Sequence, residues 1–409
     1  MAFSLSRNER MYLQIQTAIR TILNTGGTAD LAAADACRHI RLSVDNDVAL
    51  IDRPDKTGSR SATAGIAGRQ FGRWSAEASL VTSGVAGTVP DWDPILQSVM
   101  GKAATSNTGT TSIVSTTNAT PIVVTATAHG ITDGAPVFIV GSDDPAANGA
   151  WIIANGDANT FELVGSIGTA IGTAVGTVEE AANVYALDDS ILSFSMWSFR
   201  TPAALQQRVG FGNVVTELTF SLGEDVPTWS ASGEGVWVLD SEAFAAAGLT
   251  ERGGLTAFPS EPASPVTAGG LIPGFTGRFV LNGTTIASAR TAQIRIQTGN
   301  EVVKDTFGEY FPDSAEGDER NVGVSFNVYD TDATGLKALK AAAISKTALE
   351  GIFTLGTVAG NAYIFHMKGL QIAAPTLDDG QRRYSANFPE SRAHGTSITS
   401  LNEIVIYAL

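Results

Sequence analysis

A mainly β fold is predicted by the sequence: an antiparallel sandwich or barrel with a few short helices, plus a small inserted all-β domain. Many short segments alternate apolar and polar residues, which is the pattern of half-buried strands. Glycine, asparagine and aspartate stand between them, and the chain has 43 glycines. The composition also changes sharply after Lys102, towards threonine, glycine, alanine and valine. This change indicates the insertion.

Composition limits the classes of function. The 409 residues are enough for two or three domains. Charged residues make up only 16%, against about 25% in typical domains. This suits a surface largely covered by copies of the same chain, although a secreted all-β protein has a similar composition. The net charge of −15 argues against a protein that holds nucleic acid, since phosphate neutralisation needs basic residues.

No cofactor or metal is expected. Cys37 is the single cysteine, and the four histidines have no metal-ligand spacing. The chain has no run of 18 apolar residues, so no membrane insertion is expected. Charges near the N-terminus stand where a signal peptide would be apolar, which predicts synthesis in the cytoplasm.

The first elements are predicted from periodicity. Met11, Ile15, Ile19 and Ile22 are spaced by four, four and three residues, which favours a short amphipathic helix over residues 9–24, with an extended arm as the alternative. Residues 40–52 alternate and predict a strand. One or two strands follow in residues 57–80, with these core candidates: Ile66, Phe71, Trp74, Ala76 and Leu80.

A short helix is predicted after residue 93. Asp93 is placed to cap it, Pro94 suits its first position and Gly101 its end. With fewer than ten residues, this helix needs tertiary packing. The clearest helix of the chain is predicted near residues 334–346, where alanine and lysine alternate with leucine.

Three ranges describe the predicted domains. Residues 1–104 form the first part of the host domain, 105–180 the inserted small β-barrel, and 181–409 the second part. Repeated short strands bounded by glycine, asparagine or aspartate define the insert. A surface loop of the host tolerates such an insertion.

Residues that could carry chemistry have simpler structural interpretations. His129 lies in an Ala-His-Gly turn without a nucleophile motif. Trp229 and Trp237 could form a sugar platform, but strand packing is their more common use. An acidic cluster lies in a turn-rich connection and is interpreted as a solvated loop rather than as paired catalytic carboxylates: Glu309, Asp313, Glu316, Asp318 and Glu319. No enzyme is predicted.

Three segments carry a resemblance to a known family: RNERMYLQIQTAI, RPDKTGSRSATAGIAGRQFGRWSAEASL and AGTVPDWDPILQSVMGK. Together they resemble the tail tube proteins of long-tailed bacteriophages. The later strands agree with the family in order. The matching structural residues are Pro54, Gly58, Asp91, Trp92, Asp93, Pro94, Leu96 and Gly101.

The resemblance implies homohexameric rings that stack into a tube in the virion tail, each subunit adding strands to a continuous inner β-barrel. Double-stranded DNA would pass through the lumen without specific binding, and other partners would be the tape measure, tail terminator and baseplate proteins. Residues 45–75 resemble the family's long hairpin loop, which reaches the adjacent ring. The candidate inter-ring residues are Arg53, Asp55, Lys56 and Arg60.

The insert resembles a different module, the small β-barrel of ubiquitin-activating enzymes, which also occurs as a decorating domain in phage tail proteins. Residues 121–130, 148–149 and 160–163 carry this likeness, and no activating-enzyme activity comes with it. The insert is expected on the outside of the tube. The alternative function is a receptor- or glycan-binding tail adhesin component, and a glycan-degrading enzyme is a weaker third hypothesis.

Overall fold

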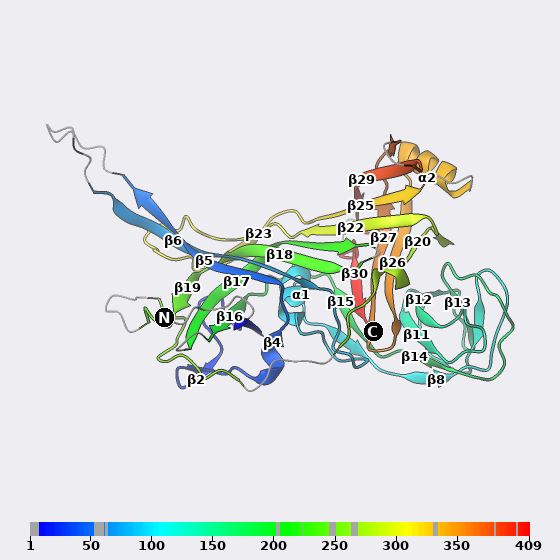
Figure 1. Cartoon of the computed structure of the whole chain (residues 1–409), viewed down its shortest axis with the longest axis horizontal. Coiled ribbons are helices and arrows are strands. Elements are labelled where there is room, and N and C mark those ends of the chain that lie inside the picture. Colours follow the sequence, from blue (N-terminus) through cyan, green and yellow to red (C-terminus); the bar gives the residue numbers. More distant parts are fainter. Residues whose placement is uncertain are drawn as a thin grey trace.

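The computed structural model describes residues 8–52, 61, 64–201, 205–223, 225–244, 251–262, 269–329, 334–379, 382–397 and 400–409. Strands account for 49% and helices for 7%, which confirms the mainly β prediction. One 19-stranded sheet folds over itself, and a separate seven-stranded sheet lies beside it (Figure 1). The arrangement is a layered β structure with a long projecting hairpin.

The first layer is an antiparallel series of strands that we call the long sheet. Along these paired strands, successive residues point alternately to a buried apolar face and to a polar face of the sheet, as the pleat requires. The strands in spatial order are β5 (Arg41–Ile51), β6 (Ile66–Ser79), β18 (Thr228–Gly235), β17 (Gln206–Leu222), β22 (Ala289–Gln297), β25 (Asn321–Tyr329), β29 (Ser385–Ala393) and β28 (Thr376–Asp378).

The second layer, which we call the cross sheet, has strands that run across the direction of the long sheet in Figure 1. Its strands in spatial order are β20 (Arg278–Leu281), β26 (Ala348–Val358), β27 (Asn361–Gln371), β30 (Val405–Ala408), β15 (Ala182–Ala186) and β7 (Thr105–Asn107). Both faces of this sheet are covered, because alternate residues of β26, β27 and β30 belong to two different apolar clusters.

The N-terminal segment is a strand, so the predicted helix over residues 9–24 is wrong. β1 (Arg10–Ile15) pairs with β16 (Phe194–Arg200) and β4 (Ala36–Cys37). Met11 and Leu13 lie in the main core, whereas Tyr12 lies in a second cluster on the other face. A strand buried on both faces has no alternating pattern, which left the helical spacing of the isoleucines as the stronger signal.

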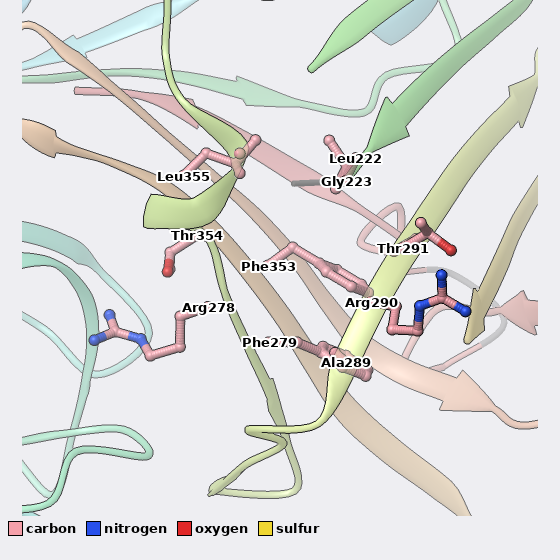
Figure 2. Close-up of a pocket in the computed structure, with 13 residues that line it drawn as sticks. Leu222, Gly223, Arg278, Phe279, Ala289, Arg290, Thr291, Phe353, Thr354 and Leu355 are labelled. Carbon is pink, nitrogen blue, oxygen red and sulfur yellow. The ribbon is translucent and has the colours of Figure 1, made fainter. Parts of the chain in front are cut away.

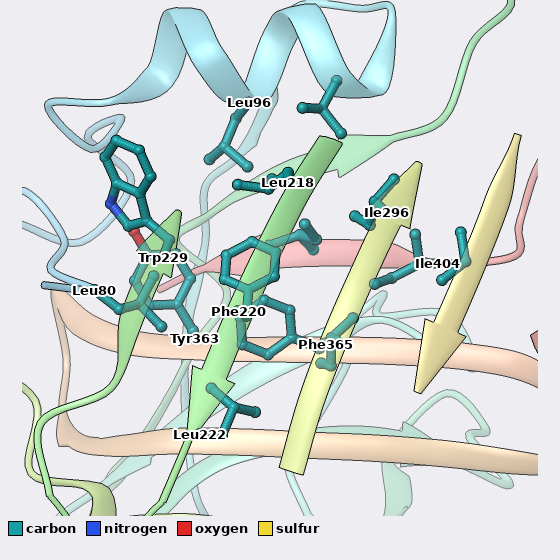
Figure 3. Close-up of a cluster of buried hydrophobic side chains, with 14 of the residues drawn as sticks. Leu80, Leu96, Leu218, Phe220, Leu222, Trp229, Ile296, Tyr363, Phe365 and Ile404 are labelled. Atoms are coloured by element: carbon teal, nitrogen blue, oxygen red, sulfur yellow. The ribbon is translucent and has the colours of Figure 1, made fainter. Parts of the chain in front are cut away.

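The main core lies between the two sheets. Figure 3 shows Leu218 and Phe220 of the long sheet facing Phe365 of the cross sheet, with Leu96 of helix α1 (Asp93–Met100) above them. Trp92, immediately before this helix, stacks on Trp229 with ring centroids 5.1 Å apart. Each fully buried side chain of this size contributes about 1.5–3 kcal/mol. The core therefore fixes the spacing of the sheets.

The predicted insert contains the seven-stranded sheet, which we call the barrel, and this sheet has its own core around Trp151, Phe161 and Val124. Its strands in spatial order are β8 (Thr110–Ser112), β14 (Thr177–Glu179), β11 (Pro136–Val140), β12 (Gly149–Ala154), β13 (Thr160–Leu163), β10 (Val123–Thr125) and β9 (Ser115–Thr116). β7, which precedes them, pairs with β15 of the cross sheet instead.

The barrel packs on the outer face of the cross sheet. Phe138 and Ile152 of the barrel are buried in one cluster with Ile364 and Tyr407 of the host. The guanidinium of Arg278 lies 3.3 Å from the ring centroid of Trp151 and donates to the carbonyl oxygen of Ala150. From one side of the molecule to the other, the order is thus the long sheet, the main core, the cross sheet and the barrel. The face of the long sheet that lies away from the core is its polar face. The barrel lies on the side away from the polar face.

The remaining elements connect these layers. α2 (Thr334–Ser345) follows β25, where the sequence predicts its clearest helix. No helix in the described part of the chain is long and apolar enough to span a membrane. The short elements are β2 (Asn24–Thr25), β3 (Thr28–Ala29), η2 (Ala33–Asp35), β19 (Trp237–Asp240), η3 (Gly274–Thr276), β21 (Thr284–Thr285), β23 (Asn300–Val302) and β24 (Ala315–Gly317).

Candidate assembly surface

The β5–β6 hairpin is the most exposed apolar feature of the long sheet. β18 pairs with β6 only from Gly72 to Ser79, so the strand segment before Gly72 projects from the body (Figure 1). Leu50 is 69% exposed, Ile51 51% and Ile66 56%. Isolated exposed apolar residues are ordinary, but a group on one projecting hairpin indicates a contact surface.

A second segment braces the hairpin. The loop between β23 and β24 runs beside β6, where the backbone N–H of Gln70 donates to the carbonyl oxygen of Tyr310 (3.2 Å). Arg69 donates to the carbonyl oxygen of Asp305 (3.0 Å), and the ammonium of Lys304 lies 4.5 Å from the ring centroid of Phe71. These contacts hold β6 against the body, while Leu50, Ile51 and Ile66 stay exposed.

The core candidates predicted for this hairpin differ in their burial. Trp74, Ala76 and Leu80 are buried, as predicted. Ile66 and Phe71 are not, because they precede the part of β6 that is covered by β18. The inter-ring candidates Arg53, Asp55, Lys56 and Arg60 lie outside the described residues, as do Pro54 and Gly58. The exposed strand ends that lead to them are described, and sequence alternation alone did not mark these ends as exposed.

Most of the Asp91–Gly101 motif is buried in the core. The Asp91 carboxylate accepts from the Arg38 guanidinium at 2.8 Å. The Trp92 indole N–H donates to the Tyr363 hydroxyl oxygen at 3.1 Å. Leu96 is fully buried. Gly101 has φ +74°, and a Cβ there would collide with the carbonyl oxygens of Asp188 and Ser190. The motif positions the sheets.

The predicted cap at Asp93 is wrong. The helix begins at Asp93, the cap position is Trp92, and no side chain caps the helix. Asp93 instead accepts from the Tyr185 hydroxyl at 2.6 Å and from the Gln97 amide at 2.5 Å. Burial raises the pKa of the Asp93 carboxyl, while both hydrogen bonds oppose that rise. Pro94 occupies the first turn, where a missing N–H costs nothing.

The polar face of the long sheet carries paired charges. Arg73 lies 2.9 Å from Asp47, and Arg295 lies 2.5 Å from Glu217. The other cations of this face and its rim with an acidic partner are Arg41 with Glu77, Arg208 with Asp45 and Asp240, Lys304 with Glu234, and Arg392 with Glu319. Serines from β6 and β18 lie between them. Such a face neutralises its own cations, which leaves little attraction for phosphate.

β5 and β28 are the two edge strands of the long sheet. Among the described residues, β5 pairs only with β6, and β28 pairs only with β29. Unpaired strand edges are templates for pairing with another chain. The long sheet thus offers one edge at each side.

The candidate residues for a chemical role lie as follows. His129 accepts from the backbone N–H of Ile131 within the predicted turn. Trp229 is buried against Trp92, so it offers no sugar platform. No group of three metal-ligating side chains occurs in the part of the chain that the structure describes. The acidic cluster is exposed in the β23–β24 loop and beside it.

The pocket in Figure 2 is a cleft of about 90 Å³ beside the stacked rings of Phe279 and Phe353. Its two arginines diverge from it. Arg278 reaches towards the barrel, where burial lowers its pKa to about 10, and Arg290 lies over the Tyr329 ring. The cleft therefore presents no cation to a ligand.

Comparison with known proteins adds no family. No family model matches the chain, and no curated protein matches it.

Proposed function

We propose that the chain is a structural subunit of a bacteriophage tail tube, which assembles as homohexameric rings that stack into the virion tail. The observation that carries this proposal is the projecting β5–β6 hairpin, whose apolar side chains lie exposed in the single chain. Exposed apolar area of this kind is stabilised when a second copy covers it.

Ring closure is supported by the two edge strands of the long sheet, β5 and β28. β5 of one copy would pair with β28 of the next, and the same contact repeated around six copies closes a ring. A closed ring of sheets removes both edges at once. This is the arrangement expected for a continuous inner β-barrel.

The lumen is the polar face in this proposal. Its cations are paired with carboxylates, and the chain carries a net charge of −15, which six copies multiply. Double-stranded DNA would then pass through the lumen without binding, since a negatively charged surface repels phosphate. The barrel is placed on the outside, because it packs on the layer that lies away from the polar face. The tape measure, tail terminator and baseplate proteins are the further partners.

Electron microscopy of the purified chain tests the proposal. We expect rings of six copies or stacked tubes. Deleting residues 53–60 should leave rings that no longer stack. Discrete trimers would favour the adhesin hypothesis, and a monomer that hydrolyses glycans would favour an enzyme.

The adhesin alternative has one observation in its favour. Ile167 and Ile171 of the barrel are 61% and 70% exposed, and Val175 is also exposed. These side chains could contact a host surface. Binding of the purified chain to host cells, lost when Ile167 and Ile171 become serine, would support that role.

A further inference from the structure

The long sheet has an even number of strands, which sets the relative direction of its two edge strands. Seven antiparallel pairings join the eight strands from β5 to β28, so β28 runs opposite to β5. Rotation about a ring axis leaves the direction of each strand along that axis unchanged. β28 of one copy would therefore meet β5 of the next copy as an antiparallel partner, which is the slightly more stable kind of pairing.

Each edge strand carries an incompletely covered leucine on the core-facing side of the sheet. Leu377 of β28 lies opposite Ala386, which is fully buried in the main core, so both point to that side. Leu377 is nevertheless 60% exposed, at an edge where no further strand pairs with β28 among the described residues. On β5, Leu42 lies opposite the buried Ala76 and packs, partly buried, against the margin of the main core. The two leucines are thus on the same side of the sheet.

The polar face carries opposite charges at the two edges. Arg41 of β5 has an 84% exposed side chain, and its contact with Glu77 in the same chain is long, at 3.9 Å. A guanidinium has five N–H donors, so this contact leaves donors for a second carboxylate. Asp378 of β28 is exposed and follows Leu377, so it points to the polar face. β28 contains no basic residue.

We propose that β28 of one copy pairs with β5 of the next in a single antiparallel register: Leu377 opposite Leu42, Asp378 opposite Arg41, and Thr376 opposite Ser43. The inference rests on the proposed function and adds the direction and the register of the contact that closes a ring. Apolar pairs and opposite charges directly across two strands both stabilise a sheet. The contact buries its leucines on the core side and pairs its charges on the polar side.

Other registers of the same two strands fit less well. A shift by one residue would turn the two leucines to opposite faces. A shift by two residues sets Leu377 opposite Val44, which is already buried. The same shift in the other direction sets Asp378 opposite His39, where burial lowers the pKa of the imidazole and favours its neutral form. A shift by four residues towards the end of β5 sets Asp378 opposite Asp45, and two like charges repel.

Disulfide formation between copies tests the register. Thr376→Cys and Ser43→Cys replace small exposed side chains that the proposed register places opposite each other. An equal mixture of the two single variants should form linked dimers under mild oxidation, and neither variant alone should; native Cys37 is buried. Thr376→Cys mixed with Asp45→Cys is the matched control. Its cysteines would be diagonal neighbours about 7–8 Å apart, too far for a disulfide, so it should react at least tenfold more slowly. Equal or faster linkage in the control, or no linkage of either pair in assembled rings, overturns the register.

Sedimentation and electron microscopy of further variants separate this contact from the proposed function. Arg41→Glu and Asp378→Arg should each reduce ring formation, and the two combined in one chain should restore it. Leu377→Ser should weaken association between copies roughly tenfold to a hundredfold, with an unchanged unfolding temperature because the side chain is exposed in the single chain. Lys346→Glu reverses an exposed charge away from both edges and is the control. Wild-type rings that neither Arg41→Glu nor Leu377→Ser weakens would overturn this contact alone, whereas a wild-type chain without rings overturns it together with the proposed function.

Discussion

The docked face of the barrel and the outer part of the β5–β6 hairpin are both apolar, but only one is covered in the single chain. Phe138, Ile152 and Ile364 are buried between barrel and host, whereas Leu50 and Ile66 are mostly exposed. The first contact stabilises the fold of one chain, and the second can stabilise only an assembly. Substitutions in the two regions should therefore separate stability from assembly.

The largest effect is expected for Ile364→Asp. The side chain is fully buried between β27 and the barrel, so a carboxylate there would be unpaired. We expect a loss of about 4 kcal/mol or more in the free energy of unfolding. Chemical denaturation measures it, with Ile364→Val as the control at about 1 kcal/mol. Equal losses for both variants would mean that the barrel does not cover this face.

Arg278→Ala should have the next largest effect. It removes the stack on Trp151 and the hydrogen bond to the carbonyl oxygen of Ala150. A desolvated cation–π contact and a hydrogen bond together suggest a loss of about 2–3 kcal/mol in the free energy of unfolding. Arg278→Lys keeps the charge without the planar group and should recover only part of it. Full recovery by lysine would contradict the role of stacking.

Asp93→Asn should change the pH dependence of stability. Burial raises the pKa of Asp93 in the folded state above its ordinary value of 3.8, so ionisation costs folded stability as the pH rises through that raised pKa. The asparagine variant avoids this cost. Its free energy of unfolding relative to wild type should therefore increase from about pH 4 up to the raised pKa and stay constant above it. Parallel pH profiles of the two proteins would show that the carboxyl is not desolvated.

The smallest effect on stability is expected for Leu50→Ser combined with Ile51→Ser. Both side chains are exposed, so the free energy of unfolding should stay within about 0.5 kcal/mol. Assembly measured by sedimentation should nevertheless weaken. Val140→Ser, an exposed position on the barrel, is the control for assembly. A loss of more than about 2 kcal/mol would mean that these two side chains are packed within the single chain, and the comparison would fail.

Local patterns predicted much of the fold. Alternation identified the strand at Arg41–Ile51, and proline followed by a late glycine identified the helix at Asp93–Met100. Alternation failed at β1, which is buried on both faces. The helix cap failed because Tyr185, which binds Asp93, lies 92 residues away. Contacts set by tertiary packing leave no local signal of this kind.

The candidate surface was less predictable than the fold. Leu50 and Ile66 alternate like core residues, but they lie beyond Gly72, where the pairing of β6 with β18 ends. The pairing of Arg295 with Glu217 joins strands 78 residues apart, so charge counts could not reveal it.

The docked barrel has a consequence for inheritance. Its contact face is made half by the insert and half by the host, through Ile152 and Trp151 on one side and Ile364 and Arg278 on the other. A gene fragment that carried residues 108–180 alone into another gene would therefore arrive with an exposed apolar face. Successful exchange requires the recipient to possess, or to acquire, matching residues on its own cross sheet. The barrel residues and the cross-sheet residues that they contact are thus expected to change together as the gene diverges.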